Sequence, residues 1–319
     1  MATEGGTRAV VAALLANTGI AVLKFLAWLL TGASSMLAES IHSVADSGNQ
    51  GLLLLGGSRS RRAATPEHPF GYGRERYVYS FIVAIVLFSV GGLFALYEAY
   101  HKFEEVHAGH PNELLEGRWW WVAVAVLVGA IVMESLSFRT AIGETNRIRG
   151  NASWAGFIRR AKSPELPVIL LEDFAALIGL VFALVGVGMT KLTGNGYWDV
   201  AGTAAIGALL VSVAIVLALE TKSLLLGEAA SPEAQQRIRS ALESTDGIER
   251  IIHMRTLHLG PDELLVAVKT GVARQASAGD VAASIDAAER AIRAAEPAAR
   301  VIYIEPDIYV EGHVAEQHT

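Results

Sequence analysis

Six apolar runs restrict the fold of this chain more than any other feature of its sequence. They lie near residues 9–30, 36–57, 77–100, 119–141, 166–190 and 198–219. A helix needs about 20 mostly apolar residues to cross the hydrocarbon core of a bilayer, and each run provides them. Because 52% of the 319 residues are hydrophobic, the chain is too apolar for an ordinary soluble domain. We therefore predict an α-helical membrane protein with six transmembrane helices, for which the lipid bilayer is a partner.

Basic residues are distributed unevenly among the segments that connect these runs. The segments 58–76 and 142–165 are rich in arginine. The other connecting segments are poor in basic residues: the first has none, the third has only Lys102 and Arg118, and the fifth has only Lys191. Cytoplasmic loops carry the excess of Lys and Arg, so this alternation places both termini in the cytoplasm. We expect a multi-pass protein, located in the plasma membrane if its source is bacterial.

The second run is unusually polar for a membrane span. It carries Glu39, His42, Asp46, Asn49 and Gln50. A charge at the bilayer centre costs roughly 3 kcal/mol, so such residues normally face a cavity, a partner or an ion. His42 and Asp46 are four residues apart and share one helix face, where an imidazole and a carboxylate can bind a divalent transition metal. The alternative is that both are packing groups that form hydrogen bonds with neighbouring helices.

Other ionisable residues lie within the remaining runs. Lys24 is expected to extend its amine toward the membrane interface. Glu134 either lines a path for water or protons, or forms hydrogen bonds near Ser135 and Ser137. The fifth run contains the adjacent carboxylates Glu172 and Asp173, for which a structural role in lipid has no simple explanation.

The composition changes near Gly227 to that of a soluble domain. Ser231 and the following proline indicate a helix start, and Asp280 is expected to cap a second helix. Strands are predicted for 248–259, 264–272 and 301–310. The order α-β-β-α-β predicts a cytoplasmic, ferredoxin-like α+β domain with both helices on one face of a three-stranded sheet. The predicted domains are therefore 1–226, in the membrane, and 227–319, which serves for dimerisation.

Several functional classes are excluded or disfavoured by the sequence. The chain has no cysteine, so disulfides and thiolate metal sites are excluded. Nothing indicates a nucleic-acid partner. An intramembrane metalloenzyme is the alternative to transport, but the H-E-x-x-H pattern of such enzymes is missing.

Three motifs together resemble the cation diffusion facilitator family: ESIHSVADSGNQ, HPFGYGRERY and VILLEDFAALIG. They are similar to the branch that includes the mitochondrial zinc exporters of eukaryotes. The resemblance implies a homodimer that exports divalent cations, usually Zn²⁺, in exchange for protons, and it implies a metal site formed by His42, Asp46 and Asp173. The metal is then a substrate, no cofactor is expected, and Co²⁺, Fe²⁺, Ni²⁺ and Cd²⁺ are further candidates.

The fifth span departs from the family pattern at the position four residues before Asp173. The family has His or Asp there, whereas this chain has Ile169. Because the two spans run antiparallel, Asp173 is expected beside His42. We predict that Glu172 supplies the fourth ligand or holds a bound water. Two alternative roles for Glu172 are that it orients His42 or Asp173 by a hydrogen bond without binding the metal, or that it transfers protons.

Two auxiliary metal sites of some relatives have also lost residues. The loop site retains only His68, with Thr65 and Tyr72 at the other positions. The cytoplasmic site retains His253 and has Glu305 in place of an aspartate, with Val268 and Tyr303 where histidines would be. We expect metal at neither place. A family member that senses metal without transporting it remains the alternative to an exporter.

Overall fold

A computed structural model describes residues 3–110 and 113–309 of the chain. Contacts divide them into two compact units. The first comprises residues up to Ser58 together with Tyr77–Lys222, and the second comprises Arg59–Arg76 together with the residues from Ser223 onward. The arginine-rich segment 59–76 therefore belongs with the C-terminal part of the chain rather than with the helices that it connects.

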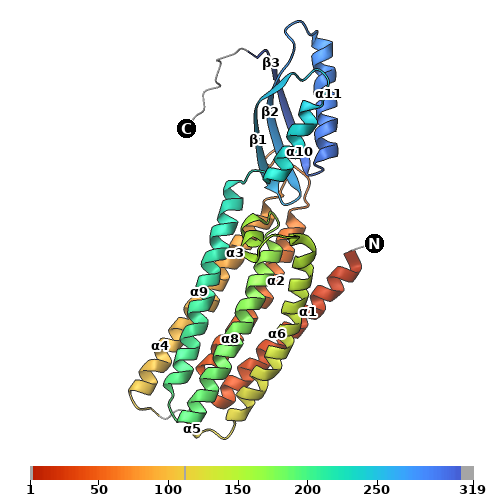
Figure 1. The fold of residues 1–319 in the computed structure, drawn as a ribbon. Coiled ribbons are helices and arrows are strands. Elements are labelled where there is room, and N and C mark those ends of the chain that lie inside the picture. Colours follow the sequence, from red (N-terminus) through yellow and green to blue (C-terminus); the bar gives the residue numbers. More distant parts are fainter. Residues whose placement is uncertain (1–2, 111–112, 310–319) are drawn as a thin grey trace. The chain divides into compact units, whose positions relative to one another are not determined.

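The first unit is helical throughout, and its long helices lie lengthwise beside one another (Figure 1). Its elements are α1 (Thr3–Thr31), α2 (Ser34–Arg59), α3 (Glu75–Val86), the π-helix η1 (Leu87–Leu93), α4 (Phe94–His107), α5 (Glu113–Glu116), α6 (Trp120–Arg149), α7 (Trp154–Arg160), α8 (Glu165–Thr193) and α9 (Tyr197–Leu226). Among the described residues, four helices are long and apolar enough to cross a membrane: Glu75–His107, Trp120–Arg149, Glu165–Thr193 and Tyr197–Leu226.

The first two predicted spans form helices that do not meet this measure within the described residues. The apolar stretch of α1, Asn17–Thr31, is shorter than a span. The polar residues of α2 lower its hydropathy, and most of them are buried, while Val44, Leu54 and Leu55 are exposed. A helix that turns its polar residues inward and its apolar residues outward is suited to lipid rather than to water.

The helix α2 contacts helices that are distant from it in sequence. Gly56 approaches α3 so closely that a Cβ atom there would lie 2.7 Å from the Cβ of Tyr79. Gly91 of η1 faces His42, and a Cβ on the neighbouring Gly92 would lie 2.7 Å from Val211 of α9. The Gly91–Gly92 pair thus permits a close contact between helices.

A carboxylate from another helix caps the N-terminus of α2. Asp199, at the start of α9, accepts hydrogen bonds from the amides of Ser34 (2.8 Å) and Ser35 (3.4 Å) and from the Ser35 hydroxyl (2.5 Å). The first amides of a helix have no partner within it, and a negative charge there also interacts favourably with the helix dipole. The buried Asp199 therefore joins the beginnings of α2 and α9.

The second unit contains a three-stranded sheet with two helices on one face (Figure 1). Its elements are α10 (Pro232–Glu243), β1 (Arg250–Gly260), β2 (Glu263–Gly271), α11 (Ala278–Ala295) and β3 (Ala299–Asp307). Strands β1 and β2 pair antiparallel, and β2 and β3 pair parallel. Ile238 and Ile292 of the helices are buried against Val266 of the central strand. The predicted element order is confirmed; of the predicted last strand, residue 310 lies outside the described residues.

One of the two predicted helix caps in this unit is confirmed, and the other lies at a different residue. Ser231 caps α10, with Pro232 following it, as predicted. For α11 the cap is Ser277 rather than Asp280, because Asp280 occupies the third helical position and completes a capping box. The hydrogen bonds from Ser277 hold the pKa of Asp280 below its usual value.

The segment 59–76 is attached to this sheet by a close backbone approach and an ion pair. A Cβ atom on Gly73 would lie 2.8 Å from the carbonyl oxygen of Leu259, so only glycine fits there. Arg76 Nη1 donates to Asp262 Oδ2 at 3.0 Å, in the turn between β1 and β2.

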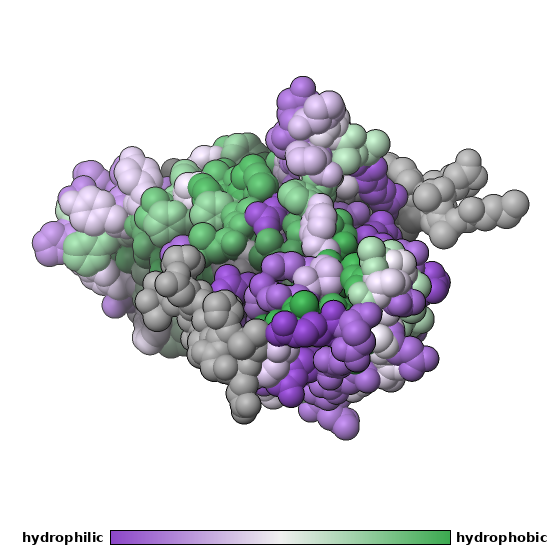
Figure 2. All heavy atoms as spheres, turned by 90° about the horizontal axis from the view of Figure 1, so that it is seen from above, coloured by the Kyte–Doolittle hydropathy of each residue, from purple (hydrophilic) through white to green (hydrophobic). Residues whose placement is uncertain are grey.

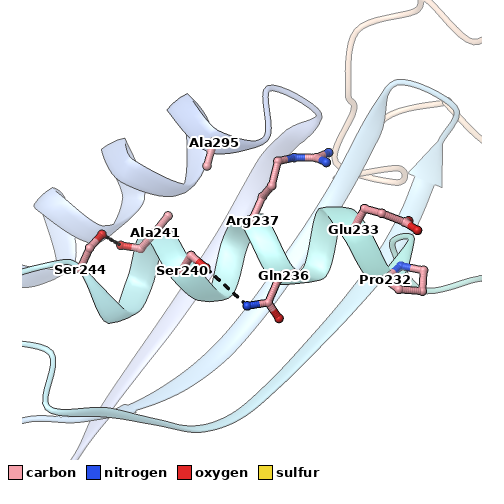
Figure 3. Close-up of a pocket in the computed structure, with 8 residues that line it drawn as sticks. All are labelled: Pro232, Glu233, Gln236, Arg237, Ser240, Ala241, Ser244 and Ala295. Atoms are coloured by element: carbon pink, nitrogen blue, oxygen red, sulfur yellow. Dashed lines mark hydrogen bonds between the residues drawn. The ribbon is translucent and has the colours of Figure 1, made fainter.

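A hollow of about 840 Å³ lies along α10 (Figure 3). It is lined by one side of α10, by Ser244 at the C-terminal cap of that helix and by Ala295 of α11. None of the predicted metal ligands lines it, so it is not part of the candidate site described below.

Candidate metal site in the helical unit

The helix α2 presents a row of buried polar side chains to its neighbours. Glu39, His42 and Asn49 are each no more than 1% exposed, and Asp46 is 16% exposed. They repeat at spacings of three and four residues, which keeps them on one side of the helix. Figure 2 shows hydrophobic as well as hydrophilic residues on the visible face of the molecule.

His42 and Asp46 lie next to each other, as predicted. His42 Nε2 is 3.4 Å from Asp46 Oδ2. Both ring nitrogens of His42 and the second carboxylate oxygen of Asp46 are buried without a hydrogen-bond partner among the described residues. Buried polar atoms are nearly always paired, so these unpaired atoms fit a ligand better than they fit helix packing. They are the donor atoms that a divalent transition metal binds.

Glu172 is the residue of α8 that faces α2. Its side chain is 5% exposed, and its Oε1 accepts a hydrogen bond of 2.7 Å from Asn49 Nδ2. Asn49 follows Asp46 by one turn on α2, so Glu172 contacts the row of polar side chains on that helix. The acidic group predicted as fourth ligand therefore contacts α2 one turn beyond Asp46 in this conformation.

Asp173 points toward α6 instead of α2. Its Oδ2 accepts a hydrogen bond of 3.0 Å from the Ser137 hydroxyl. Adjacent residues on a helix are 100° apart, and in this conformation Glu172 faces α2 while Asp173 faces α6. Among the described residues, no three His, Asp or Glu side chains are close enough together to hold a metal ion. The structure thus pairs His42 with Asp46 but does not bring all four predicted ligands together.

The level of Asp173 along the bundle also differs from the expectation. Glu172 pairs with Asn49, and a Cβ on Gly179 would lie 2.6 Å from Glu39 Oε1. Because both helices rise 1.5 Å per residue in opposite directions, these two contacts place Asp173 level with Asp46. The prediction that Asp173 lies beside His42 is therefore wrong by about one turn in this conformation.

Glu134 lies at a cavity between α1 and α6. The cavity has a volume of about 290 Å³, and Asn17, Ser137 and Thr140 supply further polar groups to its wall. The hydroxyls of Ser135 and Ser137 donate to the Ile131 carbonyl and to Asp173, respectively, rather than to Glu134. The lining of a path for water or protons, one of the two roles considered for Glu134, agrees with its position at this cavity.

Lys24 does not extend to the membrane interface, and that prediction is wrong. Its side chain is fully buried, and its amine donates to Glu39 Oε2 at 3.1 Å and to Ser43 Oγ at 2.7 Å. The ammonium and the Glu39 carboxylate neutralise each other in the interior, where either charge alone would be left uncompensated. Both charges are visible in the sequence, but Lys24 and Glu39 are 15 residues apart and lie on different helices. Their pairing could therefore not be predicted from a short stretch of sequence.

The positions of the auxiliary sites lack the residues for a metal. His253 is exposed on β1, Val268 is buried in the core of the sheet, and Tyr303 is exposed on β3. Glu305 binds Lys269, with 3.0 Å between carboxylate and amine. In the segment 59–76, the hydroxyls of Thr65 and Tyr72 lie 3.3 Å apart, and His68 packs edge-on against Tyr72.

Comparison with known proteins gives the family of the chain. Residues 10–226 match the model of the cation efflux transmembrane domain. The mouse mitochondrial proton-coupled zinc antiporter SLC30A9 is 34% identical over 260 residues, which are 81% of this chain and 44% of that protein. Metal tolerance protein C4 of Arabidopsis thaliana is 30% identical over 80% of this chain and 54% of its own length.

The chain thus spans about half the length of these curated relatives, which are named as a transporter and a metal tolerance protein and not as enzymes. Magnetosome protein MamM of Paramagnetospirillum magneticum is more distant, at 22% identity over 78% of this chain. The family match covers the helical unit, including the row of polar residues on α2 and the carboxylates of α8. This integral membrane protein belongs to the cation efflux family.

Proposed function

We propose that this protein exports a divalent transition metal, with Zn²⁺ as the main substrate, in exchange for protons. The observation that carries the proposal is the buried His42–Asp46 pair, whose nitrogen and oxygen atoms have no hydrogen-bond partner among the described residues. The zinc antiporters among the relatives support the choice of metal and of counter-ion.

The proposed ligands are His42, Asp46, Asp173 and Glu172. An imidazole nitrogen and carboxylate oxygens match the ligands that Zn²⁺ takes at about 2.0–2.2 Å. An imidazole ligand disfavours Mg²⁺ and Ca²⁺, whereas Co²⁺, Fe²⁺, Ni²⁺ and Cd²⁺ remain possible substrates. In the conformation described, Glu172 faces α2 and Asp173 faces α6. Closing the site on all four residues therefore requires α8 to turn or shift relative to α2.

Proton exchange follows from the chemistry of these ligands. A metal binds the deprotonated forms of His, Asp and Glu, so protons and metal compete for the same atoms. When the metal leaves, the ligands take up protons, and when the next metal arrives they release them. Alternating access of such a site to the two sides of the membrane couples the two flows.

The experiment that tests this function is uptake of ⁶⁵Zn into proteoliposomes with an imposed pH gradient. We expect uptake that requires the protein, rises with an opposing proton gradient and collapses when a protonophore abolishes that gradient. If the protein binds zinc tightly yet moves none under any gradient, the alternative of a sensor that does not transport is correct. If it neither binds nor moves zinc, the test is repeated with Co²⁺ and Cd²⁺ before the function is rejected.

We further propose six membrane spans with both termini in the cytoplasm, and a division of the chain into 1–226 and 227–319. The inverted polarity of α2 supports its role as a span despite its low hydropathy. The distribution of Arg and Lys among the loops supports the orientation.

Labelling of single cysteines tests this topology without background, because the chain has no cysteine. We expect Ala108→Cys to react with a membrane-impermeant maleimide added outside intact cells, and Asn151→Cys to react only after permeabilisation. Both positions are exposed in the structure, so a difference in reactivity reports the side of the membrane. The opposite pattern would overturn the proposed topology.

Finally, we propose that the protein is a homodimer. Both helices of the second unit pack on one face of the sheet, so the other face carries exposed side chains such as those of His253 and Tyr303. A second copy of the chain would cover this face.

A further inference from the structure

The ion pair between Lys24 and Glu39 is only half satisfied. Glu39 Oε2 accepts from the Lys24 amine at 3.1 Å, while Oε1 is buried without a hydrogen-bond partner among the described residues. Leaving a buried charged oxygen unpaired is costly, and a pair that served only to hold α1 against α2 would be expected to satisfy it. The unpaired oxygen indicates that Glu39 has a second partner in another state of the protein.

The unpaired oxygen lies directly against α8. A Cβ atom on Gly179 would lie 2.6 Å from Glu39 Oε1, so this position of α8 accommodates the carboxylate only because it is a glycine. Glu39 also precedes His42 by three residues, which is one helical turn along the same polar row. In the proposed topology this turn lies between His42 and the outer side of the membrane, on the route of an exported cation.

We propose that Glu39 is a second, transient binding position for the transported divalent cation, and that Lys24 is a tethered cation which occupies it when the metal is absent. The inference rests on the proposed function and adds a second position to it. A divalent cation and an ammonium at the same carboxylate repel each other, so they bind there alternately. Return of the ammonium to Glu39 then displaces the metal outward and prevents it from binding again.

The chemistry of lysine and the position of Ser43 suit this exchange. An ammonium is a compact charge on a flexible stem with three donors, so it can move without losing all its partners. Ser43 lies four residues after Glu39, and its hydroxyl accepts from the same amine at 2.7 Å. When the metal occupies Glu39, the ammonium keeps the Ser43 hydroxyl as an acceptor.

The test uses the full chain in proteoliposomes and compares Lys24→Met, Glu39→Gln and the double variant. Lys24→Met removes the competing cation, so we expect zinc to bind at least about tenfold more tightly, about 1.4 kcal/mol. Turnover of ⁶⁵Zn should fall by a similar factor because release slows. Lys24→Met alone leaves the buried Glu39 without its partner, so this variant can fail to fold. The double variant removes both charges at nearly constant volume, so it decides whether the pair has a role in transport.

We expect the double variant to melt in detergent within a few degrees of the parent and to bind zinc at His42 and Asp46 with nearly parental affinity. Its turnover should nevertheless stay at least about tenfold below that of the parent, since 1.4 kcal/mol of barrier corresponds to a tenfold change in rate. A double variant that transports like the parent would show that the pair is structural and overturn the inference, as would a double variant that does not fold. A parent protein that transports no metal contradicts the proposed function instead, so the two failures are distinguishable.

Discussion

Replacing His42 or Asp46 with alanine is expected to abolish proton-driven zinc transport. Each substitution removes one member of the pair that lies 3.4 Å apart on α2 and leaves too few ligands for a tetrahedral zinc site. Zinc affinity should fall by more than the roughly 10–100-fold that is typical of losing an outer hydrogen-bond partner of a ligand. Isothermal titration with Zn²⁺ in detergent and ⁶⁵Zn uptake in proteoliposomes measure the two effects separately.

The matched control is Ser47→Ala on the same helix. The Ser47 hydroxyl donates to the Ser43 carbonyl one turn earlier, at 3.1 Å, and not to a proposed ligand, so its loss is expected to leave the site intact. We expect parental affinity and turnover from this variant. Parental zinc binding by His42→Ala would mean that the imidazole is a packing group, and the proposed site would be rejected.

The second large effect is expected at Glu172. Glu172→Ala should weaken zinc binding by more than about 100-fold, which exceeds the loss typical of an outer partner. The reason is that Glu172 is the acidic residue of α8 that faces α2, and Ile169 cannot replace it as a ligand. Asp173→Ala is expected to abolish transport as well, because the proposed closed site includes its carboxylate.

Asn49→Ala provides a graded comparison for Glu172. It removes the 2.7 Å hydrogen bond to Glu172 but keeps the carboxylate, so a loss of zinc affinity within the range of about 10–100-fold is expected.

The pH dependence of uptake distinguishes a ligand from a proton carrier at Glu172. If Glu172→Ala binds zinc like the parent and changes only this dependence, Glu172 is part of the proton path and not a ligand.

The long helices and the α-β-β-α-β order were predictable because they depend on local patterns. Apolar runs of span length, the Ser231–Pro232 helix start and the alternation in the strands are visible in short windows of sequence. The pairing of His42 with Asp46 was predictable for the same reason, since a separation of four residues fixes their relative direction on any helix.

What the sequence could not provide is the rotation of one helix relative to another. Glu172 and Asp173 are adjacent, and only the packing of α8 decides which of them faces α2 and which reaches Ser137. The same holds for Lys24, whose partner lies on the next helix. The capping role of Ser277 is a different case, because the Ser-x-x-Asp pattern that identifies it is present in the sequence.

The carboxylate of Asp199 has a mechanical consequence for transport. Its three hydrogen bonds to Ser34 and Ser35 tie the first turn of α2 to the start of α9, and a rotation of α2 about its own axis would break them. We therefore expect α2 to keep its rotation relative to α9 during transport, with His42 and Asp46 held in place on it. The movement that brings Asp173 to the metal beside Glu172 is then expected from α8, which turns or shifts relative to α2.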